Sequence, residues 1–283
     1  MGYYDFREYL EKLEAAGELQ HVRPEVDPHL EAGAIAQRLA ERGGPAAHFW
    51  NVRNATRGTT WVAGSMSRGQ RGVWSKVAVA LERDPASTYH EVLEDVHRRT
   101  ESPIRPIQVG GGPCKQHVVR GDEVDLNAFA APTLHAQDGG PCMSSWGVLI
   151  AQEHDTGFLA WEILPLQVLS DRTLAGRLPR DSNLRRIHER YARANQHMPF
   201  AIVLGTAPVV ALAASFRRRR TDVIAPELAG ALGRQPLQLV KCETNDLLVP
   251  TTAELVIEGY IRPGETAEFG PFPGTWGYLT TGR

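Results

Sequence analysis

The 283-residue sequence has only three cysteines, Cys114, Cys142 and Cys242, and they lie far apart. A sparse, odd-numbered set without a C-x-x-C pair is not the pattern of a disulfide framework. We therefore expect reduced thiols in a cytoplasmic protein. Binding of one metal ion by all three cysteines is the minor alternative, because buried structural cysteines are common.

Long apolar runs are missing, and no stretch approaches the roughly 20 residues of a membrane span. The opening residues lack the basic-then-apolar pattern of a signal peptide, so we expect none. Neither sign of charge is in excess, with 31 Lys and Arg against 33 Asp and Glu. We therefore expect no membrane and no nucleic-acid partner. A hydrophobic content of 42% is typical of a globular protein that buries a core.

The first hundred residues alternate helix and strand patterns. Phe6, Tyr9, Leu10 and Leu13 recur at helical spacing, and Gly17 stands where a helix would end. The same kind of reasoning predicts helices over residues 4–17, 73–81 and 88–98, and a further helix that opens at Pro28 and ends at Gly43-Gly44. Strands are predicted over residues 19–26, 45–52 and 59–63. This alternation is typical of an α/β domain.

Residues 103–113 are rich in proline and glycine. Their three consecutive glycines could cradle a phosphate, but the Lys-Ser/Thr that follows in a P-loop is missing. We interpret the segment as a hinge between an N-terminal domain (1–105) and a second domain (106–283).

The second part is richer in strand patterns. Strands are predicted over residues 116–119, 146–152, 158–164, 200–204, 209–213 and 254–261, and one helix over residues 184–195. Asn245-Asp246 and Pro263-Gly264 are turn signals. The glycines and prolines of GPFPG (270–274) predict a stiff loop.

The sequence resembles the UbiD family of decarboxylases, which use prenylated FMN. The resemblance rests on VKCETNDL (240–247), AELVIEG (253–259), GPF (270–272) and YDFREYL (4–10). It implies a fold of class α/β + β, an N-terminal α/β domain followed by a split β-barrel related to flavin reductases. It also implies a short, divergent member without the usual C-terminal domain.

The resemblance implies a site as well. In the family, a flavin accepts the electrons that decarboxylation leaves on carbon, since no side chain serves well as the sink. The matching cofactor-binding positions are Trp161, Ala214, Ser215 and Glu227, and the matching metal positions are Asn183 and Glu227. Prenylated FMN, a divalent metal and potassium are the cofactors that the resemblance implies.

Several positions depart from the family pattern. The Arg that grips the substrate carboxylate corresponds to Pro165, and a metal-binding Asn corresponds to Ala160. The two acids of the acid–Gly–Pro–aromatic–Gly–acid signature fall on Phe269 and Gly274, and a slip of one residue would make Glu268 the catalytic acid. We therefore expect little or no bound prenylated FMN.

The sequence favours a UbiD-like decarboxylase homologue with a degenerate cofactor site, acting on an unsaturated, aromatic or β-keto carboxylic acid. Whether the chain is an enzyme stays open. The alternatives are a non-catalytic accessory subunit or a small-molecule-binding protein. We expect a homo-oligomer, or a heteromer with a longer UbiD-like subunit, that covers residues 207–214 or 276–279.

Other features have two interpretations each. The run Arg217–Arg220 is a solvated loop or an anion site, because Arg forks suit phosphate. Glu254 and Glu258 could shift each other's pKa, but a structural role is favoured for both. His154, His188 and His197 lack the spacing of metal ligands.

Overall fold

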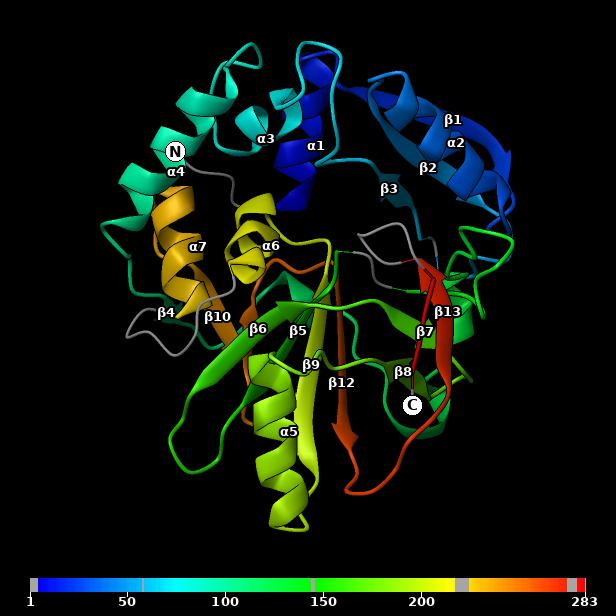
Figure 1. The fold of residues 1–283 in the computed structure, drawn as a ribbon, viewed down its shortest axis with the longest axis vertical. Helices are drawn as coiled ribbons and strands as arrows, with labels where there is room; N and C mark the ends of the chain where they lie inside the picture. Colours follow the sequence, from blue (N-terminus) through cyan, green and yellow to red (C-terminus); the bar gives the residue numbers. More distant parts are fainter. Residues whose placement is uncertain (1–4, 58, 144–145, 217–223, 274–278, 283) are drawn as a thin grey trace.

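A computed structural model of the chain describes residues 5–57, 59–143, 146–216, 224–273 and 279–282. Its first hundred residues alternate helices and strands, which occupy the upper part of Figure 1. They are α1 (Phe6–Ala15), β1 (Leu19–Val26), α2 (Glu31–Glu41), β2 (Ala46–Val52), β3 (Trp61–Ala63), α3 (Ser75–Ala80) and α4 (Tyr89–Thr100). The strand predicted at residues 19–26 is confirmed.

Two of these helices begin at side-chain caps. The Asp5 carboxylate accepts a hydrogen bond from the backbone N–H of Glu8 (2.9 Å), which fixes the start of α1. Thr88 and Glu91 form a reciprocal capping box at the start of α4. Tyr9 and Leu13, four residues apart on α1, are fully buried. The helical spacing of these apolar side chains therefore faces the core, as predicted.

The first sheet has the order β1-β2-β3, with β1 parallel to β2 and β3 antiparallel to β2. One face packs on α2, where Val22, Val26 and Phe49 meet Ile35 and Leu39. The opposite face carries the alternate residues of each strand, because successive side chains of a strand point to opposite sides.

The remaining residues add the lower part of Figure 1. The helices are α5 (Asn183–Arg193), α6 (Pro208–Ser215) and α7 (Ala225–Gly233). The strands are β4 (Ile107–Gln108), β5 (Val148–Gln152), β6 (Leu159–Ile163), β7 (Leu166–Val168), β8 (Leu174–Gly176), β9 (Met198–Leu204), β10 (Gln238–Lys241), β11 (Leu248–Pro250), β12 (Leu255–Ile261), β13 (Phe269–Pro273) and β14 (Leu279–Gly282).

A four-stranded antiparallel sheet of order β12-β9-β5-β6 is the centre of this part. Ile150 and Trp161 point from it into a core shared with α6 and α7. Leu149, Ala160 and other alternate residues point to the opposite face, which α5 covers. The strict alternation explains why one strand serves two separate cores.

The linker between the two parts is built into the structure. Its strand β4 pairs in parallel with β10, and β10 pairs with β11.

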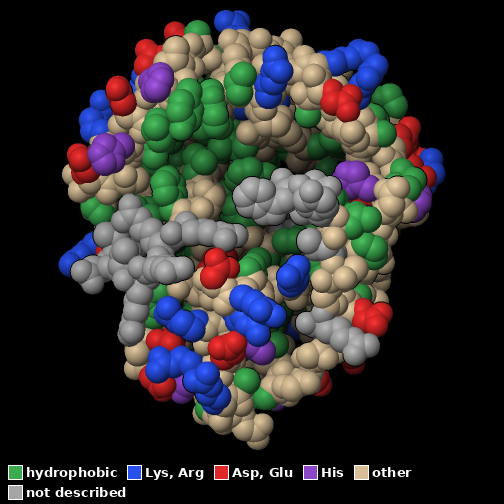
Figure 2. All heavy atoms as spheres, in the orientation of Figure 1, with side chains coloured by type: hydrophobic (Ala, Val, Ile, Leu, Met, Phe, Trp, Pro, Cys, Tyr) green, Lys and Arg blue, Asp and Glu red, His purple; other side chains and the backbone are tan. Residues whose placement is uncertain are grey.

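Figure 2 shows one face of the molecule. Hydrophobic side chains gather on its upper left, over α3 and α4, and Lys and Arg side chains gather lower down, over α5. Trp74, Tyr89 and Leu93 are the large apolar residues exposed on α4 and at the start of α3.

Four sequence expectations are wrong. Residues 209–213 are not a strand but lie in helix α6, and residues 116–119 form no strand. Residues 270–273 belong to strand β13 rather than to a loop. Residues 207–214 are largely buried, so they are not the open interface we expected; Ala207 is 3% exposed and Val210 is 0%. Residues 217–220 and 276–278 lie outside the described residues.

The mixed α/β architecture is confirmed, whereas the split barrel stays a prediction, because the strands of the described residues form separate open sheets and no closed barrel. None of the helices in the described ranges combines the length and apolar character needed to cross a membrane. The boundary at residue 105 also stays a prediction.

Candidate functional site

Trp161 lies where three elements meet. It points from β6 toward α6 and α7, is 4% exposed, and shares its core with Ala214 and Leu228. Its indole Nε1–H is buried without a hydrogen-bond partner among the described residues. A buried donor without a partner is costly, and a bound group with an acceptor atom would satisfy it.

Ser215 and Glu227 lie at the end of α6 and in the first turn of α7, the two helices that share a core with Trp161. Ala214 is buried, whereas Ser215 is exposed and its hydroxyl donates to the carbonyl oxygen of Leu212 (2.7 Å). The half-buried Glu227 carboxylate accepts from the Ile224 N–H (3.3 Å), so it caps α7. Both polar groups therefore have structural partners at helix ends.

Asn183 opens α5, on the side of the sheet opposite to the Trp161 side chain. Its backbone N–H donates to the Glu162 carboxylate (2.7 Å), which fixes the start of α5 against β6. Ala160 points to the same α5 face. Across the described part of the chain, no three His, Cys, Asp or Glu side chains are grouped so that they could hold a metal ion.

Glu268 is exposed and directly precedes β13, whereas the next residue, Phe269, is 3% exposed. The start of β13 is held tightly. The Gly270 N–H donates to the Gln167 side chain (2.9 Å), and the Gly139 N–H donates to the Pro271 carbonyl (2.8 Å). A Cβ at Gly139 would lie 1.9 Å from the Gly270 carbonyl oxygen, so only glycine fits there. Glu268 thus projects from a fixed support.

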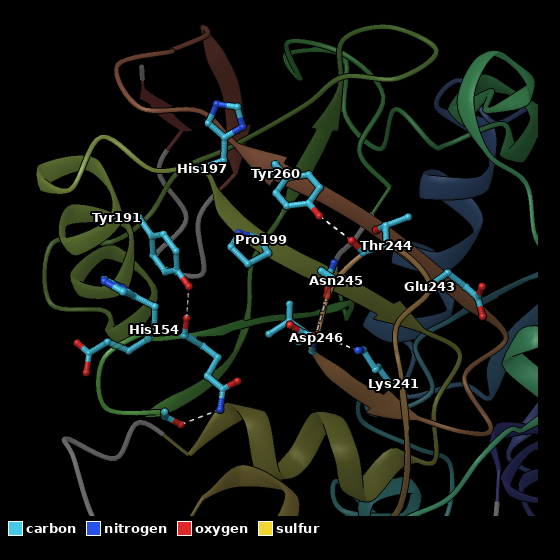
Figure 3. Close-up of a pocket in the computed structure, with 14 residues that line it drawn as sticks. His154, Tyr191, His197, Pro199, Lys241, Glu243, Thr244, Asn245, Asp246 and Tyr260 are labelled. Atoms are coloured by element: carbon cyan, nitrogen blue, oxygen red, sulfur yellow. Dashed lines mark hydrogen bonds and ion pairs between the residues drawn. The ribbon is translucent and has the colours of Figure 1, made fainter.

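A groove of about 720 Å³ opens at the far end of the four-stranded sheet, beyond the β5–β6 turn (Figure 3). None of the residues predicted for the site lines it. Its walls are the β5–β6 turn, the end of α5, the start of β9 and the β10–β11 turn. The side chains that give it chemical character are His154, Tyr191, His197, Lys241, Asn245, Asp246 and Tyr260.

Most polar groups of the groove are engaged with the protein itself. The Tyr191 hydroxyl donates to the Gln152 carbonyl (3.0 Å), and the Tyr260 hydroxyl to the Thr244 carbonyl (2.7 Å). The ion pair with Asp246 (2.5 Å) raises the pKa of Lys241 through its hydrogen bond and charge. Asn245 Nδ2 is buried without a partner in the described residues. The groove could bind a small polar molecule.

No pattern in the sequence predicted this groove. His154 and His197 are 43 positions apart, and only the pairing of β5 with β9 brings both to one end of the sheet. By contrast, the Asn245-Asp246 turn was predicted. A structural role was also predicted for Glu254 and Glu258. In the structure, both carboxylates accept hydrogen bonds from distant elements.

Comparison with known families supports the resemblance. Residues 10–96 match a model described as the 3-octaprenyl-4-hydroxybenzoate carboxy-lyase N-terminal domain. Residues 106–283 match UbiD, described as the 3-octaprenyl-4-hydroxybenzoate carboxy-lyase Rift-related domain. Together the two models account for most of the chain.

Two curated relatives are decarboxylases. The chain is 30% identical to ferulic acid decarboxylase 1 of Saccharomyces cerevisiae and 33% identical to pyrrole-2-carboxylic acid decarboxylase of Pseudomonas aeruginosa. Each match covers 97% of this chain and 56% of the relative. The chain therefore spans a little over half the length of these relatives.

Solved structures agree in fold. The UbiD-class enzyme HmfF from Pelotomaculum thermopropionicum, in complex with FMN, superposes with a TM-score of 0.87 at 33% identity. The superposition covers 98% of this chain and 60% of that enzyme. An evolved dimeric form of the same enzyme, in complex with prenylated FMN, also gives a TM-score of 0.87.

Proposed function

The chain belongs to the UbiD family, and from that premise we propose that it is a UbiD-like decarboxylase homologue with a degenerate cofactor site. Its substrate is an unsaturated, aromatic or β-keto carboxylic acid. The observation that carries the proposal is the buried Trp161 indole N–H at the meeting point of β6, α6 and α7, which has no hydrogen-bond partner among the described residues.

The residues fit one end of a flavin cofactor. Trp161, Ala214, Ser215 and Glu227 would form the wall that holds its phosphate and the accompanying ions, and Asn183 would add a weak metal ligand. A bound flavin would supply the electron sink for decarboxylation.

The residues do not fit the reacting end. Pro165 has no charge and no N–H to grip a carboxylate. Phe269 is buried where the family pattern places an acid, which leaves the exposed Glu268 as the proton donor. Among the three substrate classes a β-keto acid suits these residues best, because its own carbonyl oxygen takes the electron pair when the C–C bond to CO₂ breaks. Glu268 then delivers a proton to the carbon of the enolate.

The test is to express the chain with and without a flavin prenyltransferase and to measure bound flavin by absorbance and mass spectrometry. Both preparations are then assayed with one cinnamic-type, one heteroaromatic and one β-keto acid. We expect little flavin and flavin-independent turnover of the β-keto acid. One flavin per chain with flavin-dependent turnover would overturn the degenerate site. If none of the three acids is turned over, the hypothesis that the chain is an enzyme is rejected.

Glu268→Gln should abolish turnover and leave the melting temperature within a few degrees, since exposed substitutions usually cost under about 0.5 kcal/mol. Glu265→Gln, which changes an exposed acid three residues earlier, is the matched control and should retain activity. Equal turnover in the two variants would remove Glu268 from the site.

The second candidate function is a non-catalytic subunit that packs against a longer UbiD-like protein. The burial of Phe269 and the proline at position 165 favour it, because neither can act on a carboxylate. Light scattering of the purified chain, alone and with a full-length homologue, tests this alternative. A homo-oligomer is the expected state of the chain alone. A monodisperse monomer that does not bind the homologue would reject the hypothesis of a non-catalytic subunit.

A further inference from the structure

A cluster of two histidines and a tryptophan lies on the face of the β1-β2-β3 sheet that α2 does not cover. His21 on β1 and His48 on β2 are direct register partners, and Trp50 follows His48 on the same face. The imidazole centroids are 5.3 Å apart, and the Trp50 ring stands edge-on to both. Trp50 is 46% exposed, so the cluster opens to solvent.

The hydrogen bonds define the protonation of both rings. The Trp50 Nε1–H lies 2.9 Å from His21 Nδ1 and 3.2 Å from His48 Nδ1. An indole nitrogen only donates, so both Nδ1 atoms are unprotonated acceptors. In the neutral imidazoles each Nε2 then carries the proton. His21 Nε2–H donates to the Glu14 carboxylate and His48 Nε2–H to the Thr60 hydroxyl, each at 3.0 Å.

We propose that His21 and His48 form a binding site for a divalent d-block cation, Cu²⁺ or Zn²⁺, whose place the Trp50 N–H takes in the free protein. The Nδ1 lone pairs of His21 and His48 converge on the Trp50 N–H, and this single donor does not fully satisfy both acceptors. Imidazole nitrogen is a ligand that both cations accept. Trp50 can leave by turning outward, since it is a surface side chain and not part of a core. Water fills the remaining coordination positions.

The surroundings of the two rings match those of metal-bound imidazoles. Such rings usually donate their second N–H to a carboxylate or another oxygen, which fixes the ring and raises its basicity. Glu14 and Thr60 already do this.

Arg23 opposes the cation. Its guanidinium lies 5.0 Å from the centre of the Trp50 ring, on the same face of the sheet. The Glu14 carboxylate, which contacts His21, offsets part of that positive charge. The two residues therefore predict opposite effects on affinity: removing the charge of Arg23 strengthens binding, and removing the charge of Glu14 weakens it.

The test is calorimetric titration of the tag-free chain with Cu²⁺ and with Zn²⁺ near pH 7.5. We expect one ion per chain. His21→Gln and His48→Gln should each weaken binding at least about 10-fold, and Glu14→Gln about 10-fold, which is the lower end of the range for outer partners. His90→Gln and His97→Gln, on α4, are the matched controls and should bind as the wild type does. Equal affinity in all five variants would overturn the site.

Trp50→Phe separates this site from a purely structural cluster. It removes the competing N–H and should tighten binding, whereas a cluster that only stabilises the sheet would lose order and affinity. The chain has six tryptophans, and the part of the Cu²⁺ quenching that comes from Trp50 fluorescence should disappear in this variant. Weaker binding by Trp50→Phe, in a variant whose circular dichroism matches the wild type, would contradict the proposal. Arg23→Gln should bind more tightly, and unchanged affinity would contradict the charge argument.

Discussion

Lys76 and Glu18 are two oppositely charged side chains that are fully buried beneath residues 64–72. The Lys76 ammonium donates to the carbonyl oxygens of Gly44 and Gly64, each at 3.0 Å. The Glu18 carboxylate accepts from two backbone N–H groups and from the Ser75 hydroxyl. Each charge is therefore satisfied by hydrogen bonds, as buried charges must be. These hydrogen bonds hold the loop of residues 64–72 against α3 and the start of β1.

Burial lowers the pKa of Lys76 to about 8, while Glu18 opposes the shift. Between pH 8 and 10.5 the unfolded chain therefore holds a proton that the folded protein has lost. Stability contributed by this group should rise with pH across that window, by up to about 1.4 kcal/mol per pH unit. Below pH 8 both states are protonated, and the contribution is flat.

The measurement is urea unfolding of the wild type and Lys76→Met at several pH values from 7 to 10.5. Other groups titrate in this range, so the difference between the two proteins is the relevant quantity. The wild type should gain stability relative to the variant as the pH rises. Parallel profiles would show that Lys76 keeps its ordinary pKa.

At the scale of residues, the sequence predicted local roles better than convergent ones. The Asn245-Asp246 turn has a local cause, since the Asn245 side chain accepts from the Leu247 N–H (3.0 Å). The meeting of His21, His48 and Trp50 depends on the register of β1 against β2. That register was not available from periodicity, so the cluster was not predicted.

At the scale of elements, Glu258 on β12 acts as a clamp on the β10–β11 turn. Its carboxylate accepts from the backbone N–H groups of Glu243 (2.8 Å) and Thr244 (2.6 Å) and from the Thr244 hydroxyl (2.6 Å). Hydrogen bonds to a charged acceptor contribute more than neutral ones. The turn, which forms one wall of the groove, is therefore fixed from another sheet.

Glu258→Ala should lower the free energy of unfolding by about 1.5–3 kcal/mol, the range for hydrogen bonds to charged groups. Glu265→Ala, which removes an exposed partner of Arg262, should cost under about 1 kcal/mol. Chemical denaturation of both variants gives the comparison. Equal losses would show that the clamp contributes no more than a surface ion pair.

Elements with a clear period were predicted, and those with a short apolar run were not. Residues 19–26 form the strand that was expected. Residues 209–213, within PVVALAAS (208–215), were expected to form a strand, and Val209 and Val210 are of a residue type that favours strands. Pro208 at the first helical position and the following alanines instead favour helix α6. A run this short and largely buried carries no period to decide between the two.

At the scale of the whole molecule, the two predicted domains share one core. Tyr9, Leu13 and Leu81 from the first hundred residues pack in the same cluster as Ile150 and Leu232. Arg99 on α4 adds a hydrogen bond to the carbonyl oxygen of Leu232, at the end of α7 (2.5 Å). Arg7 forms a bidentate pair with Glu254. A core divided between two segments makes the folding of each depend on the other.

Thermal unfolding should therefore show one cooperative transition, although family models match two separate segments. Leu81 and Leu232 are both fully buried, one in each segment. Truncation of a buried leucine to alanine costs about 2–5 kcal/mol. Leu81→Ala and Leu232→Ala should each lower the single transition by on the order of 5–10 °C, and the exposed Leu93→Ala should shift it far less. Differential scanning calorimetry of the three variants measures this. If two transitions appear, and Leu81→Ala moves one while Leu232→Ala moves the other, the segments fold independently and the shared core does not couple them.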